Sequence, residues 1–506
     1  MGPRPAMARA LFVSVFVIAT CGLIYELLAS TIASYLLGDS VTQFSTIIGV
    51  YLFAMGIGSY LAKFIVRRLV AWFIQIEILV GLIGGFSSLG LFLAFAEVEA
   101  FRLVLYGWVF VTGTLVGMEI PLLLRILEGQ LQFSELVSRV LSLDYLGALA
   151  ASLLFPLWLV PQVGLMRSAF VFGAANLLVA LWACRVLLPE GKLGRRLWWQ
   201  ALVGLVILLA GVAASDHLTH FTEESLYDDA VIFATSTPYQ RIALTRAGSE
   251  VRLYLNGHLQ FSSFDEYRYH EALVHPALGS VEQPRRVLVL GGGDGLAVRE
   301  VLRHASVEEV VLVDLDPEMT RLFRDRDDFA ALNDFALRSE RVRVENADAF
   351  VWLEAYREAG GEPFDGIVID FPDPSSYSLG KLYSTTFYRR LMPHLALGGV
   401  AVIQSTSPLF ARRSFWCIVE TVRAVGLDAT PLHAYVPSFG EWGFVIATRG
   451  AYSAPDRYPE GLRFLTPQVA GGLFEFPKDM APLEVEVNRL NDQRLVRYYD
   501  SEWSRL

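Results

Sequence analysis

Five aspartates in the second half of the chain lie at or just after the ends of predicted strands, and their carboxylates can do chemistry together. They are Asp294, Asp314, Asp348, Asp370 and Asp373. A carboxylate can accept hydrogen bonds from a ribose diol, attract an ammonium group, or take a proton from an amine. An isolated aspartate more often caps a turn or a helix. Five of them at successive strand ends indicate one binding site.

The glycine loop around Asp294 predicts what kind of ligand this site holds. Residues 287–290 are wholly apolar, which is typical of a strand buried on both faces. Gly291, Gly293 and two further glycines allow the backbone to turn sharply and to approach a ligand closely. Such loops usually bind phosphates, but Asp294 puts a negative charge where a phosphate would lie. We therefore expect a nucleoside that carries a positive charge.

The next two aspartates suit the nucleoside itself. Asp314 can accept two hydrogen bonds from the ribose hydroxyls, and Asp348 can accept one from the adenine amino group. That much fits any enzyme that uses S-adenosylmethionine. Asp294, however, would repel the carboxylate of that cofactor and attract the ammonium group that remains after decarboxylation. The sequence therefore favours decarboxylated S-adenosylmethionine as the co-substrate.

Asp370 and Asp373 indicate the reaction. A primary amine is protonated near neutrality, with an unperturbed pKa of about 10, so a base must remove a proton before the nitrogen attacks carbon. We predict that Asp370 is this base, and that Asp373, three residues later, holds the amine in line.

Alternating strands and helices must position these groups. The sequence from residue 285 onward predicts strands at 287–290, 310–314, 342–345, 366–370, 399–404 and 443–447. This alternation predicts a doubly wound α/β Rossmann-like domain, in which ligands bind at the carboxyl ends of the strands. Ahead of it, residues 239–262 predict a small β-hairpin lobe with a turn at Asn256–Gly257. A polar connection, which begins at Asp216, precedes this lobe.

The first half of the chain predicts a membrane domain. The 506-residue chain is 54% hydrophobic, and its mean hydropathy is +0.42. Seven apolar runs can each cross about 30 Å of hydrocarbon, and they lie near 10–37, 44–65, 70–96, 102–126, 140–161, 166–188 and 197–215. We therefore expect an all-α bundle of seven transmembrane helices at 1–215, a linker and β lobe at 216–284, a catalytic domain at 285–450, and a tail packed on that domain at 451–506.

Basic residues predict the orientation of this bundle. Eleven of them fall at alternate helix ends, whereas the opposite connections hold only Arg102 and Arg167. The positive-inside rule then places the N-terminus in the cytoplasm of a multi-pass protein of the cell (inner) membrane. Seven crossings would leave the second half outside, away from a cytosolic co-substrate, and a re-entrant segment would reverse this. The side of the catalytic domain stays open.

The predicted bundle contains polar and small residues that need a role. Four acids lie inside or near the ends of its helices, at Glu26, Glu77, Glu119 and Asp144. Because carboxylates inside a membrane are costly, they can be explained as the lining of a route for a polycation. Alternatively, they pair with basic residues at helix ends such as Arg125 and Arg139, or they fix helix packing. Gly56, Gly58 and Gly147 indicate close contacts between helices.

Charge and cysteine content exclude other classes of protein. Residues 1–215 hold 13 basic and 10 acidic residues, whereas the rest of the chain holds 29 and 42. An acidic second half argues against nucleic acid as a partner and favours a cationic ligand. The three cysteines, Cys21, Cys184 and Cys417, are too far apart to indicate a disulfide framework or a metal site.

A set of short motifs between residues 228 and 450 carries a family resemblance. The motifs are Tyr239-Gln240, Leu255-Asn256-Gly257 through Gln260, Asp265 to Glu271, Gly291 to Gly295, Arg299 to His304, Asp314 to Pro317, Asp348 to Phe350, Asp370 to Pro374, Gln404-Ser405 and Trp442 to Phe444. Together they resemble the polyamine aminopropyltransferases, a family typified by spermidine synthase. The membrane half and a tail at Val487 to Gln493 are similar to the multi-pass bacterial branch of that family.

The resemblance implies an enzyme that releases 5′-methylthioadenosine and needs no metal or prosthetic group. It implies that the nucleoside is bound by Gln240, Gly291, Gly293, Asp314, Asp348 and Ala349. It also implies that the aminopropyl end is bound by Gln260, His270 and Asp294, and the acceptor by Tyr269, Asp373 and Gln404, with Asp370 as the base. The expected partners are a polyamine substrate, the lipid bilayer and further copies of the chain in a homodimer or higher homo-oligomer.

His270 has two interpretations. A histidine at helical spacing is more often structural than catalytic when the residues alone are considered. The resemblance instead places His270 in the pocket, as a hydrogen-bond partner rather than a base.

Departures from the family pattern concern the acceptor. Phe371-Pro372 stand where family members commonly have two serines, and a Gly-Pro-Ala-Glu-Ser run that usually follows is missing. The segment whose tyrosine touches the acceptor corresponds to residues 435–440 here, with Pro437 in the place of the tyrosine. This form is similar to that of thermospermine synthases. The acceptor is therefore either putrescine, which would give spermidine, or a longer polyamine.

Two other functions stay open from the sequence. The first is a polyamine transporter or sensor whose synthase-like domain binds ligand without turnover, a hypothesis motivated by the intramembrane acids. The second is a methyltransferase that uses S-adenosylmethionine, which would have to tolerate the cofactor carboxylate near Asp294.

Overall fold

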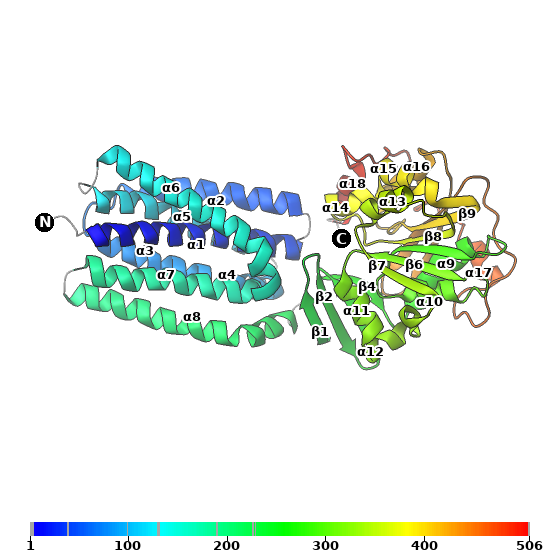
Figure 1. Ribbon diagram of the computed structural model, residues 1–506, viewed down its shortest axis with the longest axis horizontal. Helices are drawn as coiled ribbons and strands as arrows, with labels where there is room; N and C mark the ends of the chain where they lie inside the picture. The colour runs from blue at the N-terminus through cyan, green and yellow to red at the C-terminus, as the bar shows by residue number, and fades with distance from the viewer. Residues whose placement is uncertain are drawn as a thin grey trace. The chain divides into compact units, whose positions relative to one another are not determined.

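The computed structural model divides the chain into two compact units, Met1–Ile232 and Phe233–Leu506 (Figure 1). It describes residues 5–503 apart from 38–39, 99, 129–131, 189–190, 225–226 and 228. Arg4, one of the basic residues that predict the orientation, lies outside the described residues. Each unit has hydrophobic clusters of its own. The finer domain boundaries predicted from the sequence stay predictions.

The first unit is a bundle of long apolar helices. They are α1 (Pro5–Leu37), α2 (Ser40–Ala62), α3 (Leu69–Gly85), α4 (Ser87–Glu97), α5 (Phe101–Leu127), α6 (Phe133–Leu154) with a π-helical continuation (Phe155–Val163), α7 (Leu165–Leu187) and α8 (Lys192–Glu224). Among the described residues, six helices are long and apolar enough to cross a membrane, and the pair α3 and α4, bent by 48°, can form a seventh crossing. The run expected at 70–96 is thus broken near Phe86, and α8 continues beyond the predicted end at residue 215.

Glycines allow some of these helices to approach closely. A Cβ added at Gly58 would lie 1.9 Å from the carbonyl oxygen of Thr114 on α5, and one added at Gly147 would lie 2.7 Å from that of Phe16 on α1. The predicted close contacts at Gly58 and Gly147 are therefore confirmed. The one predicted at Gly56 is wrong, since a Cβ there would meet nothing within 4 Å.

Two of the four acids lie deep inside this bundle. Glu77 and Glu119 are fully buried, and among the described residues both carboxylate oxygens of Glu77 and Oε1 of Glu119 have no hydrogen-bond partner. The guanidinium of Arg125 instead donates to the carbonyl oxygen of Ala62 at 3.0 Å, and Arg139 pairs with Glu135. These contacts do not support the interpretation that the two arginines neutralise the buried acids.

The second unit begins with a four-stranded sheet in the order β1-β2-β3-β4. Its strands are β1 (Ala230–Ser236), β2 (Arg241–Ala247), β3 (Glu250–Leu255) and β4 (His258–Ser262). The predicted turn joins β3 to β4, where Asn256 and Gly257 both have positive φ, at 50° and 80°. β1 was not predicted, because it lies within the polar connection that precedes the predicted lobe.

A seven-stranded sheet forms the centre of the second unit, in the order β10-β11-β9-β8-β5-β6-β7. The strands are β5 (Arg286–Gly291), β6 (Glu309–Asp314), β7 (Val342–Asn346), β8 (Phe364–Asp370), β9 (Leu395–Gln404), β10 (Asp428–Val436) and β11 (Gly440–Thr448). The strands β5 to β9 pair in parallel, whereas β11 is antiparallel to β9 and to β10. The predicted Rossmann-like α/β domain is confirmed.

Helices cover both faces of this sheet. They are α9 (Glu266–Leu278), α10 (Leu296–Leu302), α11 (Pro317–Asp325), α12 (Asp327–Ala330), α13 (Ala349–Glu358), α14 (Tyr377–Gly380), α15 (Thr385–Leu391), α16 (Arg412–Arg423), α17 (Pro467–Gly472) and α18 (Arg494–Trp503). Leu288 and Leu290 belong to one hydrophobic cluster with side chains of α13, α15 and α16, which Figure 1 shows together along one side of the sheet. Successive strand residues point to opposite faces, so Val287 and Val289 face the other layer.

Six of the seven central strands match the prediction, and β10 was missed. Pro431 lies in the middle of β10, and proline argues against a strand because it cannot donate to the ladder. The sheet order explains why it is tolerated here, because β10 is an edge strand.

The close packing of α2 on α5 leads to a stability prediction. We expect Gly58→Ala to destabilise the helical unit by about 2 kcal/mol, because the added methyl group overlaps the backbone of α5. Thermal unfolding of the purified chain in detergent can be followed with a thiol-reactive dye, since Cys21 and Cys184 are buried in this unit. The matched control is Gly56→Ala, which adds the same methyl group in open space and should not lower the melting temperature. Equal effects of the two substitutions would contradict the packing argument.

Candidate active site

The site lies where the loop after β5 meets the end of β8. Gly291 pairs with Asp370 in the register of the two strands. A Cβ on Gly291, whose φ is +78°, would lie 2.3 Å from the carbonyl oxygen of Asp370, so a side chain cannot be accommodated there. The strand order reverses between β5 and β8, since β6 lies on the other side of β5. Ligands of open α/β sheets bind at such a switch point, and the structure brings Asp294 and Asp370 to this place.

Asp370, the predicted base, is surrounded by residues of α9. The hydroxyl of Tyr269 donates to Oδ1 of Asp370 at 2.6 Å, and Nε2 of His270 lies 4.0 Å from Oδ2. Burial raises the pKa of Asp370 above its usual value, against the opposing effects of His270 and of the Tyr269 hydrogen bond. Relative to the charged form, the neutral form of Asp370 is therefore more stable in the site than it would be in water. This property suits a group that takes up a proton.

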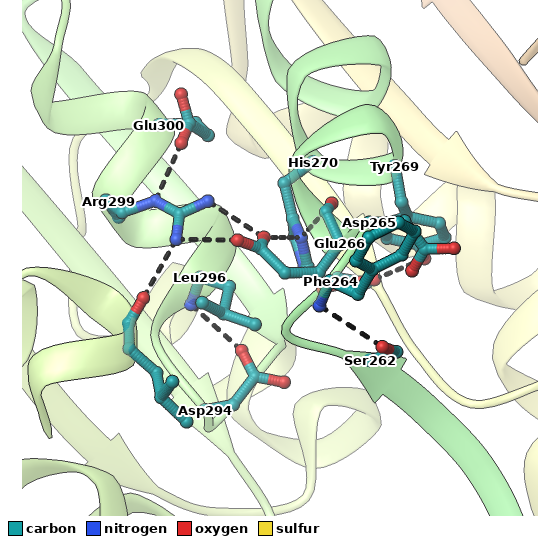
Figure 2. A network of polar contacts seen from close by, with 12 residues as sticks. Ser262, Phe264, Asp265, Glu266, Tyr269, His270, Asp294, Leu296, Arg299 and Glu300 are labelled. Carbon is teal, nitrogen blue, oxygen red and sulfur yellow. Dashed lines mark hydrogen bonds and ion pairs between the residues drawn. The ribbon is translucent and has the colours of Figure 1, made fainter. Parts of the chain in front are cut away.

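Asp294 lies in the glycine loop near the same histidine (Figure 2). Its Oδ1 accepts a hydrogen bond from the backbone N–H of Leu296 at 2.9 Å, at the start of α10. Burial raises the pKa of Asp294 to about 6; the positive charge of His270 opposes this rise, and Asp370 adds to it. Asp294 is thus a buried acid whose charged form would be stabilised by an added cation.

Two of the residues predicted to bind the nucleoside lie near the end of β6. Asp314, at the end of β6, accepts hydrogen bonds from the backbone N–H groups of Gly293 at 3.1 Å and Asp316 at 2.8 Å. Burial raises the pKa of Asp314 to about 7. The side-chain amide of Gln240 donates to Asp316 at 3.1 Å, so this predicted residue lies beside the end of β6 but makes its contact with a different carboxylate.

Asp348 precedes α13 and already has a cationic partner. Its Oδ1 accepts from the backbone N–H of Phe350 at 2.9 Å, and its Oδ2 is 2.7 Å from Nζ of Lys381. Ala349, the first residue of α13, is buried. Lys381 follows α14, and no pattern in the sequence indicates that it pairs with Asp348.

Asp373 and Gln404 form a second polar group. The amide nitrogen of Gln404 donates to Oδ1 of Asp373 at 3.0 Å, and the hydroxyl of Thr406 donates to Oδ2 at 2.9 Å. The hydroxyl of Tyr499, on α18, also interacts with Asp373. Burial raises the pKa of Asp373, and these three hydrogen bonds oppose the rise. Sequence reasoning missed Thr406 and Tyr499; nothing in the tail pattern indicated that α18 reaches the site.

Gln260 makes its contacts within β4. Its amide nitrogen donates to the carbonyl oxygens of His258 at 3.1 Å and Leu259 at 3.4 Å. Within the described part of the chain it makes no hydrogen bond or ion pair with Asp294 or His270, so a role at the aminopropyl end stays a prediction.

The segment expected to touch the acceptor lies beside Tyr269. The ring of Phe439 is 6.3 Å from that of Tyr269 and 5.2 Å from that of Trp442, between ring centres. Tyr435 is 52% exposed, and its carbonyl oxygen accepts from Arg268 at 2.6 Å. An aromatic side chain of this segment therefore faces the site, although Pro437 replaces the usual tyrosine.

The second unit is a Rossmann-like α/β domain with buried acids at the ends of its parallel strands, an arrangement suited to a group-transfer enzyme with a cationic substrate. Within the part of the chain that the structure describes, no group of three or more His, Cys, Asp or Glu side chains is arranged to hold a metal ion. Comparison with known proteins is more specific. A family profile described as the spermine/spermidine synthase domain matches residues 266–457.

Whole-chain relatives extend this match to the helical unit. The chain is 54% identical over 501 residues to a polyamine aminopropyltransferase of Leptospira interrogans, which covers 99% of this chain and 100% of the relative. It is 41% identical over 507 residues to polyamine aminopropyltransferase 1 of Streptomyces coelicolor, covering 97% and 94%. The chain therefore belongs to the polyamine aminopropyltransferase family.

A solved structure of spermidine synthase in complex with the transition-state analogue AdoDATO is 24% identical, with a TM-score of 0.46, and covers 49% of this chain and 88% of that one.

Membership of the family, which rests on the whole-chain relatives, confirms the predicted resemblance and the assignment as an enzyme. It does not favour the transporter, sensor or methyltransferase interpretations.

The raised pKa of Asp294 predicts how stability depends on pH. The folded pKa of about 6 exceeds the unfolded value of about 3.9, so the folded state binds the proton more tightly between these values. The stability associated with this proton is present at low pH and is lost as the pH rises through the folded pKa. We therefore expect Asp294→Asn, which stays neutral, to exceed the wild-type protein in stability at pH 8, by on the order of 2 kcal/mol.

Thermal unfolding of the two ligand-free proteins between pH 5 and pH 8 measures this difference, which should shrink toward pH 5. Asp428→Asn, at an exposed position of β10, is the matched control and should follow the wild-type protein. A difference between Asp294→Asn and wild type that does not change with pH would contradict the argument.

Proposed function

We propose that the second unit transfers the aminopropyl group of decarboxylated S-adenosylmethionine to an amine of a polyamine, and that the helical unit anchors the enzyme in a membrane. The observation that carries the catalytic part is the position of Asp370. It lies at the end of β8 and accepts a hydrogen bond from Tyr269. Its charge acts on that of Asp294, and Asp373 follows it by three residues. A diamine or triamine can bind through a second amine while the reacting nitrogen faces the base.

The reaction is an in-line displacement at the carbon next to the sulfonium. The lone pair of the deprotonated amine forms the new C–N bond, the C–S bond breaks, and its electron pair stays on sulfur, which leaves as the thioether of 5′-methylthioadenosine. Asp370 takes the proton that the attacking ammonium loses. Because the sulfonium is already a good leaving group, the enzyme mainly positions and deprotonates the amine.

Each remaining site residue has a proposed task. Asp314 binds the ribose diol, with Gly291 and Gly293 forming the floor of the loop, while Asp348, Ala349 and Gln240 border the base. Asp294, His270 and Gln260 bind the aminopropyl end. Asp373, held by Gln404, binds the acceptor amine. The acids with raised pKa values support this assignment, since a dicationic donor and a polycationic acceptor would both stabilise their charged forms.

We expect Asp370→Asn to reduce kcat at least about 100-fold, since the amide cannot accept the proton. Donor binding should change little. The assay measures release of 5′-methylthioadenosine from decarboxylated S-adenosylmethionine with putrescine, spermidine and longer amines as acceptors. The panel also identifies the acceptor, because the true acceptor should give the highest kcat/KM.

Asp373→Asn provides the comparison, and should raise KM for the acceptor more than it lowers kcat. Asp428→Asn, which lies far from the chemistry in sequence and on an exposed edge, should retain wild-type turnover. Full turnover in Asp370→Asn would contradict the assignment of Asp370 as the base. If no amine led to release of methylthioadenosine, the proposed reaction would be wrong.

The membrane proposal rests on the length and apolar character of the helices. If α3 and α4 form one broken span, the chain crosses seven times. A cytoplasmic N-terminus, as the basic helix ends favour, then puts residues 233–506 on the opposite side. The oligomeric state remains a proposal as well, with a homodimer or higher homo-oligomer expected.

A cysteine engineered at exposed Glu358 tests this topology. The native Cys21, Cys184 and Cys417 are buried, so they give a low background. If the chain crosses seven times, a membrane-impermeant thiol reagent added to intact cells should label Glu358→Cys. Labelling only after the cells are opened would mean six crossings, with α3 and α4 re-entrant. Recovery of the chain in the soluble fraction would remove the membrane proposal.

A further inference from the structure

Behind His270 lies a buried row of alternating charges (Figure 2). Nδ1 of His270 is 2.9 Å from Oε2 of Glu266. The guanidinium of Arg299 holds both oxygens of Glu266, at 2.9 and 2.8 Å, and its Nε donates to Glu300 at 2.7 Å. All four side chains are at most about one-tenth exposed. Such a row fixes the ring of His270 in one orientation.

The contacts also fix which nitrogen of His270 carries a hydrogen. Nδ1 faces two oxygens, the carboxylate of Glu266 and the backbone carbonyl of Glu266, each at 2.9 Å. Both are acceptors, so Nδ1 must donate. A neutral His270 therefore has its lone pair on Nε2, the nitrogen that faces Asp370 at 4.0 Å.

The charged groups around His270 decide whether Nε2 is also protonated. On α9 these are Glu266 and the hydroxyl of Tyr269, on α10 Arg299, in the glycine loop Asp294, and on β8 Asp370. Burial lowers the pKa of His270, but Glu266, Asp370 and Asp294 together raise it above its usual value. Without donor, His270 thus keeps its second proton, on Nε2, to higher pH than a free histidine does.

A protonated His270 conflicts with the donor's ammonium group. Both are positively charged and both can only donate hydrogen bonds. We propose that binding of the donor's ammonium group expels the proton from Nε2 of His270, and that Glu266 and Arg299 are positioning residues which keep Nδ1–H in place so that Nε2 becomes the acceptor. The N–H bond at Nε2 breaks, its electron pair stays on nitrogen, and the proton goes to solvent. This inference rests on the proposed function of the site.

Because the donor's ammonium group replaces a proton on His270, the affinity for the donor should rise with pH. Below the pKa of donor-free His270, one proton leaves for each donor bound, so affinity rises about tenfold per pH unit. Above that pKa there is no proton to expel, and affinity levels off. The by-product 5′-methylthioadenosine has the same nucleoside but no ammonium and no sulfonium, so it should not expel this proton.

Titration calorimetry of the full-length purified enzyme tests the inference. Decarboxylated S-adenosylmethionine and 5′-methylthioadenosine are each titrated between pH 6.5 and 8.5, in pairs of buffers that differ in ionisation enthalpy. The difference between the two ligands gives the number of protons released by the aminopropyl end. Any proton exchange at Asp314 cancels in this difference, because both ligands carry the ribose. Asp294, with a pKa of about 6, is largely ionised over the upper part of this range.

We expect the donor to release up to one proton more than 5′-methylthioadenosine, with the excess falling as the pH rises. His270→Gln should abolish the excess at pH 7.5, since glutamine does not titrate. Glu266→Gln should lower it, because loss of the neighbouring carboxylate removes the main cause of the raised pKa. If Glu266 had only a structural role, Glu266→Gln would lower the melting temperature and leave the number of released protons unchanged.

His275→Gln is the matched control. His275 is also a buried histidine of α9 and contacts Glu300 at 3.0 Å, but its other nitrogen contacts His304 rather than the site. It should keep the wild-type proton count. Equal counts for the two ligands on the wild-type enzyme, or an unchanged excess in His270→Gln, would overturn the inference. If the enzyme still turned over, the proposed function would survive that result; failure to bind or use the donor would instead remove the function.

Discussion

The close approach of the glycine loop to the end of β8 is the constraint on which the rest of the site depends. Gly291 and Asp370 are neighbours in the register of two parallel strands, and the space between them excludes even a methyl group. A side chain at Gly291 would push the loop away from β8 and separate Asp294 from Asp370. The strand order adds to this, because the switch between β5 and β8 leaves the carboxyl ends of both strands free of a crossing connection.

Around this point, the fold keeps several acids in an environment that disfavours their charge. Asp294, Asp370 and Asp373 are all affected by burial, and in each the pKa rises. Such an arrangement costs stability in the ligand-free protein. The same burial strengthens the attraction of each acid for a cation, because the interaction takes place in a region of low dielectric constant. The cost and the proposed selectivity for amines therefore have one physical origin.

Much of this could be predicted from the sequence, because the strong signals were local. Apolar or alternating runs bounded by turns marked six of the seven central strands, and the aspartates at the ends of those runs marked the candidate site. The failures involve information that is not local. β10 was missed because Pro431 excludes a central strand but not an edge strand, and edge position is a property of the whole sheet. Tyr499 and Lys381 reach Asp373 and Asp348 through tertiary packing, and no spacing rule predicts such pairs.

The distribution of counter-charges within the site follows the chemistry proposed for each acid. Among the described residues, Lys381 is the one lysine or arginine paired with any of the five aspartates, and its partner is Asp348, for which we propose a place beside the neutral base of the donor. Asp370 and Asp373 are instead contacted by hydroxyl, amide and imidazole groups. A lysine or arginine beside them would compete permanently with the substrate amine. His270 can also be positively charged, but it is consistent with this rule. Among the described side chains near these acids, it is the one that can give up its charge near neutral pH when a cation arrives.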